Sequence, residues 1–153
     1  MSEVQAREWL GRHLGVAEAD QLDGTVVSVA PARSLGLVTL LIGWYEHVTR
    51  MEREIELPDS DRSVWGAHDL IAADILRDFL ARGLESLSGG ESRNFLNALN
   101  EADSRFLSYT EVDELGVLLR LDDDGPEVRG WWWTRIPRSG PIRRDLDRFS
   151  ASF

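Results

Sequence analysis

The chain has 153 residues and a formal net charge of -10 at pH 7, and hydrophobic residues make up 42% of it. This length and composition indicate a single globular domain, residues 1–153. The absence of cysteine excludes disulfides, cysteine nucleophiles and cysteine-ligated metals. All 17 basic residues are arginine, and the acidic balance argues against a nucleic-acid partner, whose phosphates need a basic surface.

The start of the chain does not resemble a secretion signal, because its first ten residues are polar and of mixed charge. The longest apolar stretch, residues 35–45, is interrupted by Gly36, Thr39 and Gly43 and is too short to cross a bilayer. We therefore expect a cytoplasmic protein without a membrane partner.

The first part of the chain is predicted to be helical, with one short strand. Residues 4–14 have the apolar spacing of a short amphipathic helix. Residues 25–30 are rich in β-branched side chains and predict a strand. Residues 37–55 return to helical spacing. From residue 45 to residue 57 the alternation also suits a strand, but the run of helix-forming residues there favours a helix.

Two further helices are predicted in the middle of the chain. Residues 64–87 carry one apolar stripe, formed by Ala72, Ile75, Leu76, Phe79, Leu80, Leu84 and Leu87. The polar residues of this helix are expected to face solvent: Asp74, Arg77, Asp78, Arg82 and Glu85. Ser88 and Glu91 predict a capping box for the next helix. The apolar face of that helix contains Phe95, Leu99, Ala102 and Phe106.

Strand patterning is predicted near the C-terminus. Residues 116–121 and 127–135 flank an acidic turn at residues 122–126 and predict a β-hairpin. Residues 141–149 predict a short final helix with proline at its first position. We therefore expect an α+β fold, with a body of three to five helices, a C-terminal β-hairpin and a terminal helix. An all-α chain with extended C-terminal loops is the alternative.

Three consecutive tryptophans, Trp131, Trp132 and Trp133, lie in the second predicted hairpin strand. Side chains alternate between the two faces of a strand, so Trp131 and Trp133 would share one face and Trp132 the other. We expect two of the indoles in the core and the third partly exposed, as a binding anchor. Arg129 and Arg135 are close enough in sequence to stack on the indoles.

His68 and Asp69 form a dipeptide that occurs in metal-dependent phosphohydrolases, and His47 lies upstream. His68 is also spaced to lie beside the apolar stripe of its helix, which favours a packed histidine without a metal. Neither a serine-nucleophile motif nor a phosphate-binding loop is present. A small metal-dependent hydrolase using His47, His68 and Asp69 stays open as an alternative, and we expect no cofactor.

Carboxylates gather in two clusters. The first cluster contains Glu52, Glu54, Glu56, Asp59 and Asp61, and the second contains Asp122, Asp123, Asp124 and Glu127. Neither cluster has the spacing of a calcium-binding EF-hand loop. Each is either a solvated segment or a docking surface for a basic protein. The C-terminal arginines are expected to pair with this acidic body: Arg135, Arg138, Arg143, Arg144 and Arg148.

Two segments, Asn100-Glu-Ala-Asp-Ser-Arg-Phe-Leu-Ser-Tyr-Thr110 and Gly130-Trp-Trp-Trp-Thr-Arg-Ile-Pro137, resemble small acidic actinobacterial proteins. Some of these proteins look like immunity proteins of polymorphic or contact-dependent toxin systems. The resemblance implies a non-enzymatic inhibitor that binds a cognate basic toxin domain, often a nuclease, and blocks its active site. It carries over no catalytic residue.

The first hypothesis is therefore a binding protein of the immunity or antitoxin type. Its contact surface would contain one exposed tryptophan of residues 131–133 together with the second acidic cluster, or the first acidic cluster. A regulatory domain that binds a small ligand in an aromatic-lined pocket is a further alternative, besides the metal-dependent hydrolase. The oligomeric state does not follow from the sequence.

Overall fold

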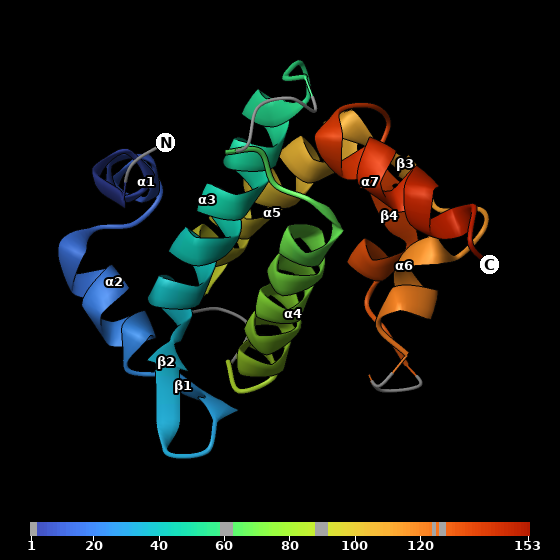
Figure 1. Cartoon of the computed structure of the whole chain (residues 1–153). Coiled ribbons are helices and arrows are strands. Elements are labelled where there is room, and N and C mark those ends of the chain that lie inside the picture. The colour runs from blue at the N-terminus through green and yellow to red at the C-terminus, as the bar shows by residue number, and fades with distance from the viewer. Residues whose placement is uncertain (1–2, 59–62, 88–91, 124, 126–127) are drawn as a thin grey trace.

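The computed structural model describes residues 3–58, 63–87, 92–123, 125 and 128–153. In these residues it has a mixed α+β architecture that is 64% helical, with seven α-helices and two small antiparallel two-stranded sheets. Figure 1 shows the two N-terminal helices on one side of the molecule and the C-terminal elements, including one of the sheets, on the other. The predicted α+β class is confirmed, with one α-helix more than the upper expectation of five body helices and a terminal helix.

The N-terminal part consists of two short helices and a hairpin: α1 (Glu3–Gly11), α2 (Val16–Asp23), β1 (Val26–Ala30) and β2 (Arg33–Gly36). The strand predicted at residues 25–30 is confirmed as β1, which pairs antiparallel with β2. The first predicted helix ends three residues earlier than expected, at Gly11.

Three long helices form the body: α3 (Leu37–Glu54), α4 (Ala67–Leu84) and α5 (Arg93–Tyr109). The helix predicted at residues 37–55 is confirmed, and α3 packs against α1, α2, α4 and α5. Helix α3 is therefore buried on several sides, and Trp44 has no exposed surface. At Gly43 a β-carbon would come within 2.9 Å of Leu76, so this glycine permits the close approach of α3 and α4.

Helix α4 is confirmed as a helix, and Arg82 and Glu85 are exposed as predicted, but the prediction that Asp74 and Arg77 face solvent is wrong. Asp74 and Arg77 are buried, at 0% and 5% exposed, whereas Ile75 from the predicted apolar stripe is 38% exposed. The reason is that α4 contacts α3 and also the C-terminal part of the chain. A helix covered on two sides buries residues beyond a single apolar stripe.

The C-terminal part contains five elements: β3 (Thr110–Val112), α6 (Val117–Leu121), the 3-10 helix η1 (Trp131–Thr134), β4 (Arg135–Pro137) and α7 (Pro141–Ser150). The small sheet pairs β3 with β4, with Thr110 opposite Pro137. The hairpin predicted at residues 116–121 and 127–135 is therefore wrong in its first strand and mostly wrong in its second. Residues 117–121 form a helix instead, because Val117 and Leu118 are both drawn into the core.

Two of the remaining predictions are confirmed, and one falls on residues outside the described part of the chain. The final helix is confirmed, with Pro141 in its first turn and Ile142 and Leu146 buried. Helix α5 is confirmed with its apolar face buried. The capping box expected at Ser88 and Glu91 lies outside the described residues. No helix in the described part of the chain has the length and apolar character needed to span a membrane.

Candidate functional site

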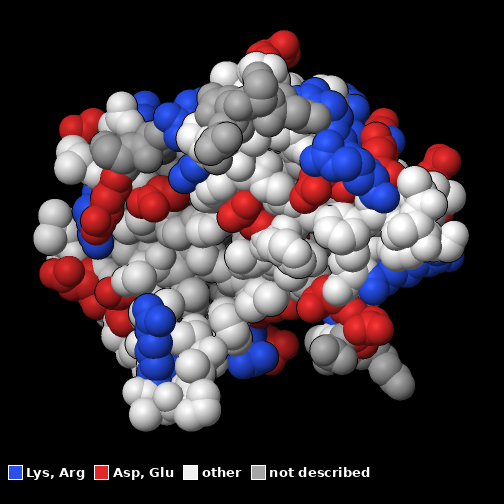
Figure 2. Space-filling model, in the orientation of Figure 1, with Lys and Arg blue, Asp and Glu red and all other residues white. Residues whose placement is uncertain are grey.

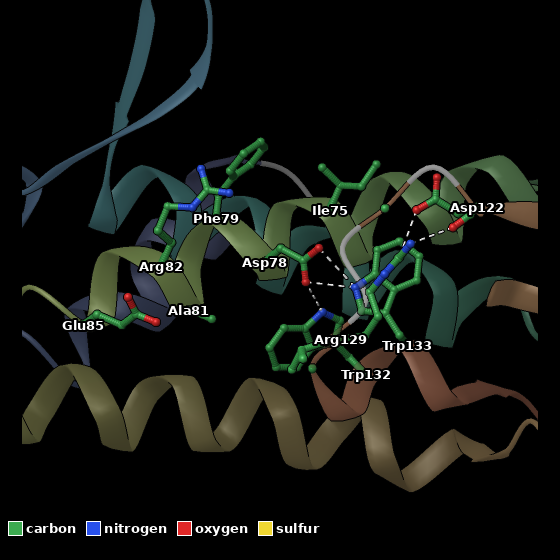
Figure 3. Close-up of a pocket in the computed structure, with 13 residues that line it drawn as sticks. Ile75, Asp78, Phe79, Ala81, Arg82, Glu85, Asp122, Arg129, Trp132 and Trp133 are labelled. Atoms are coloured by element: carbon green, nitrogen blue, oxygen red, sulfur yellow. Dashed lines mark hydrogen bonds and ion pairs between the residues drawn. The ribbon is translucent and has the colours of Figure 1, made fainter.

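An open groove of about 650 Å³ lies between α4 and the segment that leads into η1. We call it the α4 groove; Figure 3 shows the side chains around it. Helix α4 contributes five of its lining residues, Ile75, Asp78, Phe79, Ala81 and Arg82, and Glu85 follows at the end of the helix. The opposite wall includes Val128, Arg129, Trp132 and Trp133. The groove thus combines apolar walls with a few charged groups, as binding sites commonly do.

Asp78 is the shared acceptor of two indoles in this groove. Trp132 Nε1 donates to Asp78 Oδ1 at 2.9 Å, and Trp133 Nε1 donates to the same oxygen at 2.9 Å and to Oδ2 at 3.1 Å. In Figure 3 the two indole nitrogens point at this one carboxylate. Asp78 therefore fixes the orientation of two neighbouring rings at once.

The 3-10 conformation of η1 explains how both indoles reach Asp78, because consecutive side chains are about 120° apart in a 3-10 helix rather than on opposite faces. The predicted alternation, with Trp131 and Trp133 on one face and Trp132 on the other, is therefore wrong. The expectation of two buried indoles and one partly exposed is confirmed: Trp132 and Trp133 are buried, and Trp131 is 38% exposed. At Gly130 a β-carbon would overlap the ring of Trp132, so only glycine fits there.

Two arginines cover the faces of the buried indoles. Arg77 lies 4.3 Å from the centre of the Trp132 ring, and Arg129 lies 4.4 Å from that of Trp133. The stacking predicted for Arg129 is confirmed. Each guanidinium also holds an aspartate: Arg77 donates to Asp103 at 3.0 and 3.1 Å, and Arg129 donates to Asp122 at 3.0 Å. These arginines thus tie the η1 segment to α4, α5 and the acidic turn.

A fully buried carboxyl group, that of Asp74, lies on α4 one turn before Asp78. In the described part of the chain neither of its oxygens has a hydrogen-bond partner, and Arg77 Nη1 also lacks one. Burial raises the pKa of Asp74 well above its usual range, and the nearby Asp78 raises it further, while Arg129 and Arg77 lower it less. This environment favours the neutral acid.

The second acidic cluster borders the α4 groove. Asp122 lines the groove and is paired with Arg129, and Asp123 is exposed. Asp124 and Glu127 lie outside the described residues. The structure thus brings Asp122 beside the buried Trp132 and Trp133, whereas the partly exposed Trp131, which the binding hypothesis would use, does not line this groove.

The first acidic cluster lies at the end of α3, away from the groove. Two of its carboxylates form ion pairs with arginines of this chain. Glu52 pairs with Arg105 at 3.0 Å, and Glu54 pairs with Arg50 at 2.6 Å. Glu56 is exposed, and Asp59 and Asp61 lie outside the described residues. In Figure 1 this end of α3 lies at the top of the molecule, away from α6, which leads to the second cluster. The structure therefore does not join the two clusters.

The histidines proposed as metal ligands have other contacts. His47 Nδ1 donates to the Gly43 carbonyl at 2.7 Å, and the ring of His68 packs edge-on against Phe149. Asp69 Oδ2 accepts a hydrogen bond from the backbone of Gly66 at 2.9 Å and so caps α4. Among the described residues no three His, Asp or Glu side chains are grouped to hold a metal. The structure does not assemble the set that the hydrolase alternative needs.

The C-terminal arginines contact other parts of the fold, and the expected ion pairing with the acidic body is seen at Arg143. Arg143 pairs with Glu111 at 2.5 Å, and Arg135 and Arg144 donate to backbone carbonyls at 2.6 and 2.8 Å. Arg138 donates to the carbonyl of Ser108. Arg148 pairs with Asp145 at 3.3 Å.

A second hollow of about 710 Å³ lies beside the β3–β4 sheet and α7. Three of its carboxylates already have partners: Arg143 pairs with both Glu111 and Asp147, and Asp113 accepts the backbone N–H of Leu118. The α4 groove contains Asp78, whose hydrogen bonds come from neutral indoles, and it is therefore the better candidate site.

Sequence reasoning missed Asp78 and Asp74, because they were assigned to a solvent-facing side of the helix. One signal was available: two indoles expected in the core need buried acceptors for their N–H groups, and Asp78 is the acceptor for both. Comparison with known proteins adds nothing to this description, since no family model, curated protein or solved structure matches the chain.

Proposed function

We propose that the protein is a non-enzymatic inhibitor of the immunity type, which binds a basic protein partner such as a toxin domain. The observation that carries this proposal is the α4 groove, an open hollow with apolar walls and a carboxylate, Asp78, held in place by two indoles. A preorganised site loses less conformational freedom on binding than a flexible one.

The charge of the molecule supports a basic partner. The net charge is -10, and a field of this sign accelerates encounter with a positively charged protein. Figure 2 shows the face of the molecule seen in Figure 1, with acidic side chains scattered over it and arginines between them. Long-range attraction therefore comes from the whole body, while a groove supplies the place where contact becomes specific.

Exposed apolar residues flank the tryptophan segment and supply a second element of a binding surface. Val128 is 88% exposed on the groove wall, and Trp131 keeps a partly exposed ring beside the buried Trp132. Aromatic anchors that become buried on binding contribute a large share of interface energy. We place the protein in the cytoplasm, where an immunity protein would protect the cell that makes the toxin.

The proposal is tested by co-expression with the C-terminal domain of a secreted or toxin-like protein encoded beside this chain. We expect a stoichiometric complex, loss of toxin activity, and an association rate that falls steeply with salt. Failure of the two proteins to co-purify would overturn the proposal. Stoichiometric metal in the purified protein, lost on His68→Ala, would favour the hydrolase instead.

The same material separates the inhibitor from a small-ligand-binding domain. A small-ligand domain would show a shift of tryptophan fluorescence with a low-molecular-weight compound and no partner protein. The inhibitor is expected to show its fluorescence change only with the partner domain or with basic segments of it.

A further inference from the structure

We propose that the α4 groove receives an arginine or lysine side chain of the basic partner and pairs it with the Asp78 carboxylate. This inference rests on the proposed function and identifies the chemistry that the groove would recognise. It is carried by the juxtaposition of a fixed carboxylate, apolar walls and a local excess of acidic groups.

Asp78 has acceptor capacity left for a partner. An ionised carboxylate offers about four acceptor positions. The indole N–H groups of Trp132 and Trp133 supply two short contacts to Oδ1 and one longer contact to Oδ2. These donors are neutral, so they orient the carboxylate without cancelling its charge. A side chain that is already oriented forms an ion pair at a lower entropic cost.

The neighbouring arginines are directed to other acceptors. Arg77 forms its ion pair with Asp103, and Arg129 forms its ion pair with Asp122. Arg82 reaches the carbonyl of Ser28 at 3.5 Å. Within the described residues Asp78 therefore has indole partners but no ion pair.

Acidic groups outnumber basic ones around the two indoles. Among the described residues that line the groove, Asp78, Glu85 and Asp122 are acidic and Arg82 and Arg129 are basic. Arg129 pairs with Asp122 and Arg82 lies over the ring of Phe79, so one carboxylate is in excess and, among these described residues, Asp78 has no arginine partner. A cation from a partner would balance this charge.

The walls suit the stem of a long cationic side chain. Ile75 is 38% exposed and Phe79 is half-buried, and both line the groove with Val128. Lysine and arginine place their methylene stems along apolar surface while the charged end reaches a polar group. A free acidic side chain would instead meet Asp78 and Glu85 and be repelled.

The test uses the full chain and three short peptides: acetyl-Leu-Arg-Leu-amide, its lysine equivalent, and the same peptide with citrulline, the neutral isostere of arginine. Binding is followed through the indole N–H resonances of Trp132 and Trp133 in nitrogen–proton correlation spectra. We expect both cationic peptides to shift these two resonances and the citrulline peptide to leave them in place. A difference between arginine and lysine tells which cation the groove prefers.

The variant Asp78→Asn keeps an oxygen acceptor for the indoles and removes the charge. We expect it to weaken binding of the arginine peptide about tenfold, the loss typical of one charge-assisted contact. The matched control is Asp123→Asn, which makes the same change of charge on the exposed turn beside the groove and should alter affinity less than about twofold.

Equal shifts with the citrulline peptide, or no shift of either resonance with the cationic peptides, would overturn the inference. These peptide measurements use the unmodified chain, so they decide the question even if Asp78→Asn does not fold. The proposed function is tested separately, by co-purification with the toxin domain. A chain that binds a basic toxin domain equally well with and without Asp78→Asn remains an inhibitor that does not use this groove.

Discussion

The chain uses the same contact, an indole N–H donated to a carboxylate, at two places with opposite electrostatic surroundings. At the N-terminal corner Trp9 Nε1 donates to Glu101 Oε2 at 2.9 Å, and His13 lies 2.5 Å from the same oxygen. At the α4 groove Trp132 and Trp133 donate to Asp78, and the neighbouring Asp74 is buried without a partner. The Glu101 side chain is 45% exposed and has two hydrogen-bond partners, whereas Asp74 is fully buried and has none among the described residues.

The pKa values move in opposite directions as a result. Burial by itself would raise the pKa of Glu101, but hydrogen bonds from His13 and Trp9 outweigh it and the pKa is lowered. At Asp74 burial dominates and the pKa is raised. Lowering the pH should therefore remove the stabilising contribution of Glu101 at the N-terminal corner and remove the destabilising contribution of Asp74 beside the α4 groove.

The largest expected effect is at Trp133, which is 1% exposed and forms part of the wall of the α4 groove. Trp133→Ala removes a large buried ring and should lower the free energy of unfolding by about 3–5 kcal/mol, measured by urea denaturation. The control is Trp131→Ala, which should cost about 1 kcal/mol or less because that ring is partly exposed. Equal losses of unfolding free energy in the two variants would contradict the difference in burial between Trp133 and Trp131.

A smaller loss is expected at Asp103, whose carboxylate accepts two bonds from Arg77 and one from Trp44. Asp103→Asn leaves the buried Arg77 charge without its counter-ion, and should lower the free energy of unfolding by about 3 kcal/mol at neutral pH. Chemical denaturation of this variant beside Asp123→Asn gives the measurement. A loss no greater than that of Asp123→Asn would show that Arg77 draws its compensation from another group.

Asp74→Asn should have the opposite sign. Because the folded pKa is raised, the unfolded chain binds fewer protons between the two pKa values, and the native protein loses stability as pH rises through that window. Asparagine does not ionise, so the two proteins should be about equally stable at about pH 3.

Above the ordinary pKa of an aspartate, the Asn variant should gain about 1.4 kcal/mol over the native chain per pH unit, until the folded pKa is reached. Urea denaturation across a pH series measures this difference. An Asn variant less stable than the native protein at neutral pH would contradict it, since Asp74 would then be a paired carboxylate.

The smallest effect is expected at Glu101, whose side chain is 45% exposed. Its pKa is lowered in the folded chain, so its contribution is present above the unfolded pKa and is lost as pH falls through the folded pKa. Glu101→Gln should cost under about 1 kcal/mol at neutral pH, because solvent screens the contact. The control is Glu8→Gln, at an exposed glutamate. If the free energy of unfolding depends on pH equally in both variants, the contacts of Glu101 do not contribute to stability.

Much of the helical architecture follows from the sequence. Helix α3 and helix α5 were predictable because their apolar residues repeat at helical spacing along one long segment. The final helix, with Pro141 at its start, was predictable for the same reason. The strand at residues 26–30 was predictable from its β-branched residues. In these segments the local preference and the tertiary packing agree.

The candidate site was predictable only in part. The tryptophans and Asp122 are adjacent in the sequence to the turn that borders the groove, so they could be named. Asp74, Arg77 and Asp78 were assigned to solvent, because a polar residue on an amphipathic helix normally faces water. Their burial depends on a second layer of chain covering α4, which a local pattern does not contain.

By itself the sequence determined the three long helices and the final helix, the acidic charge and the presence of three adjacent indoles. Only the tertiary structure decided that residues 131–134 form a 3-10 helix rather than a strand. The physical reason is that the indole N–H groups gain a shared buried acceptor, Asp78, only when Trp132 and Trp133 turn toward α4 together. That contact joins residues more than fifty positions apart, and no spacing rule within either segment specifies it.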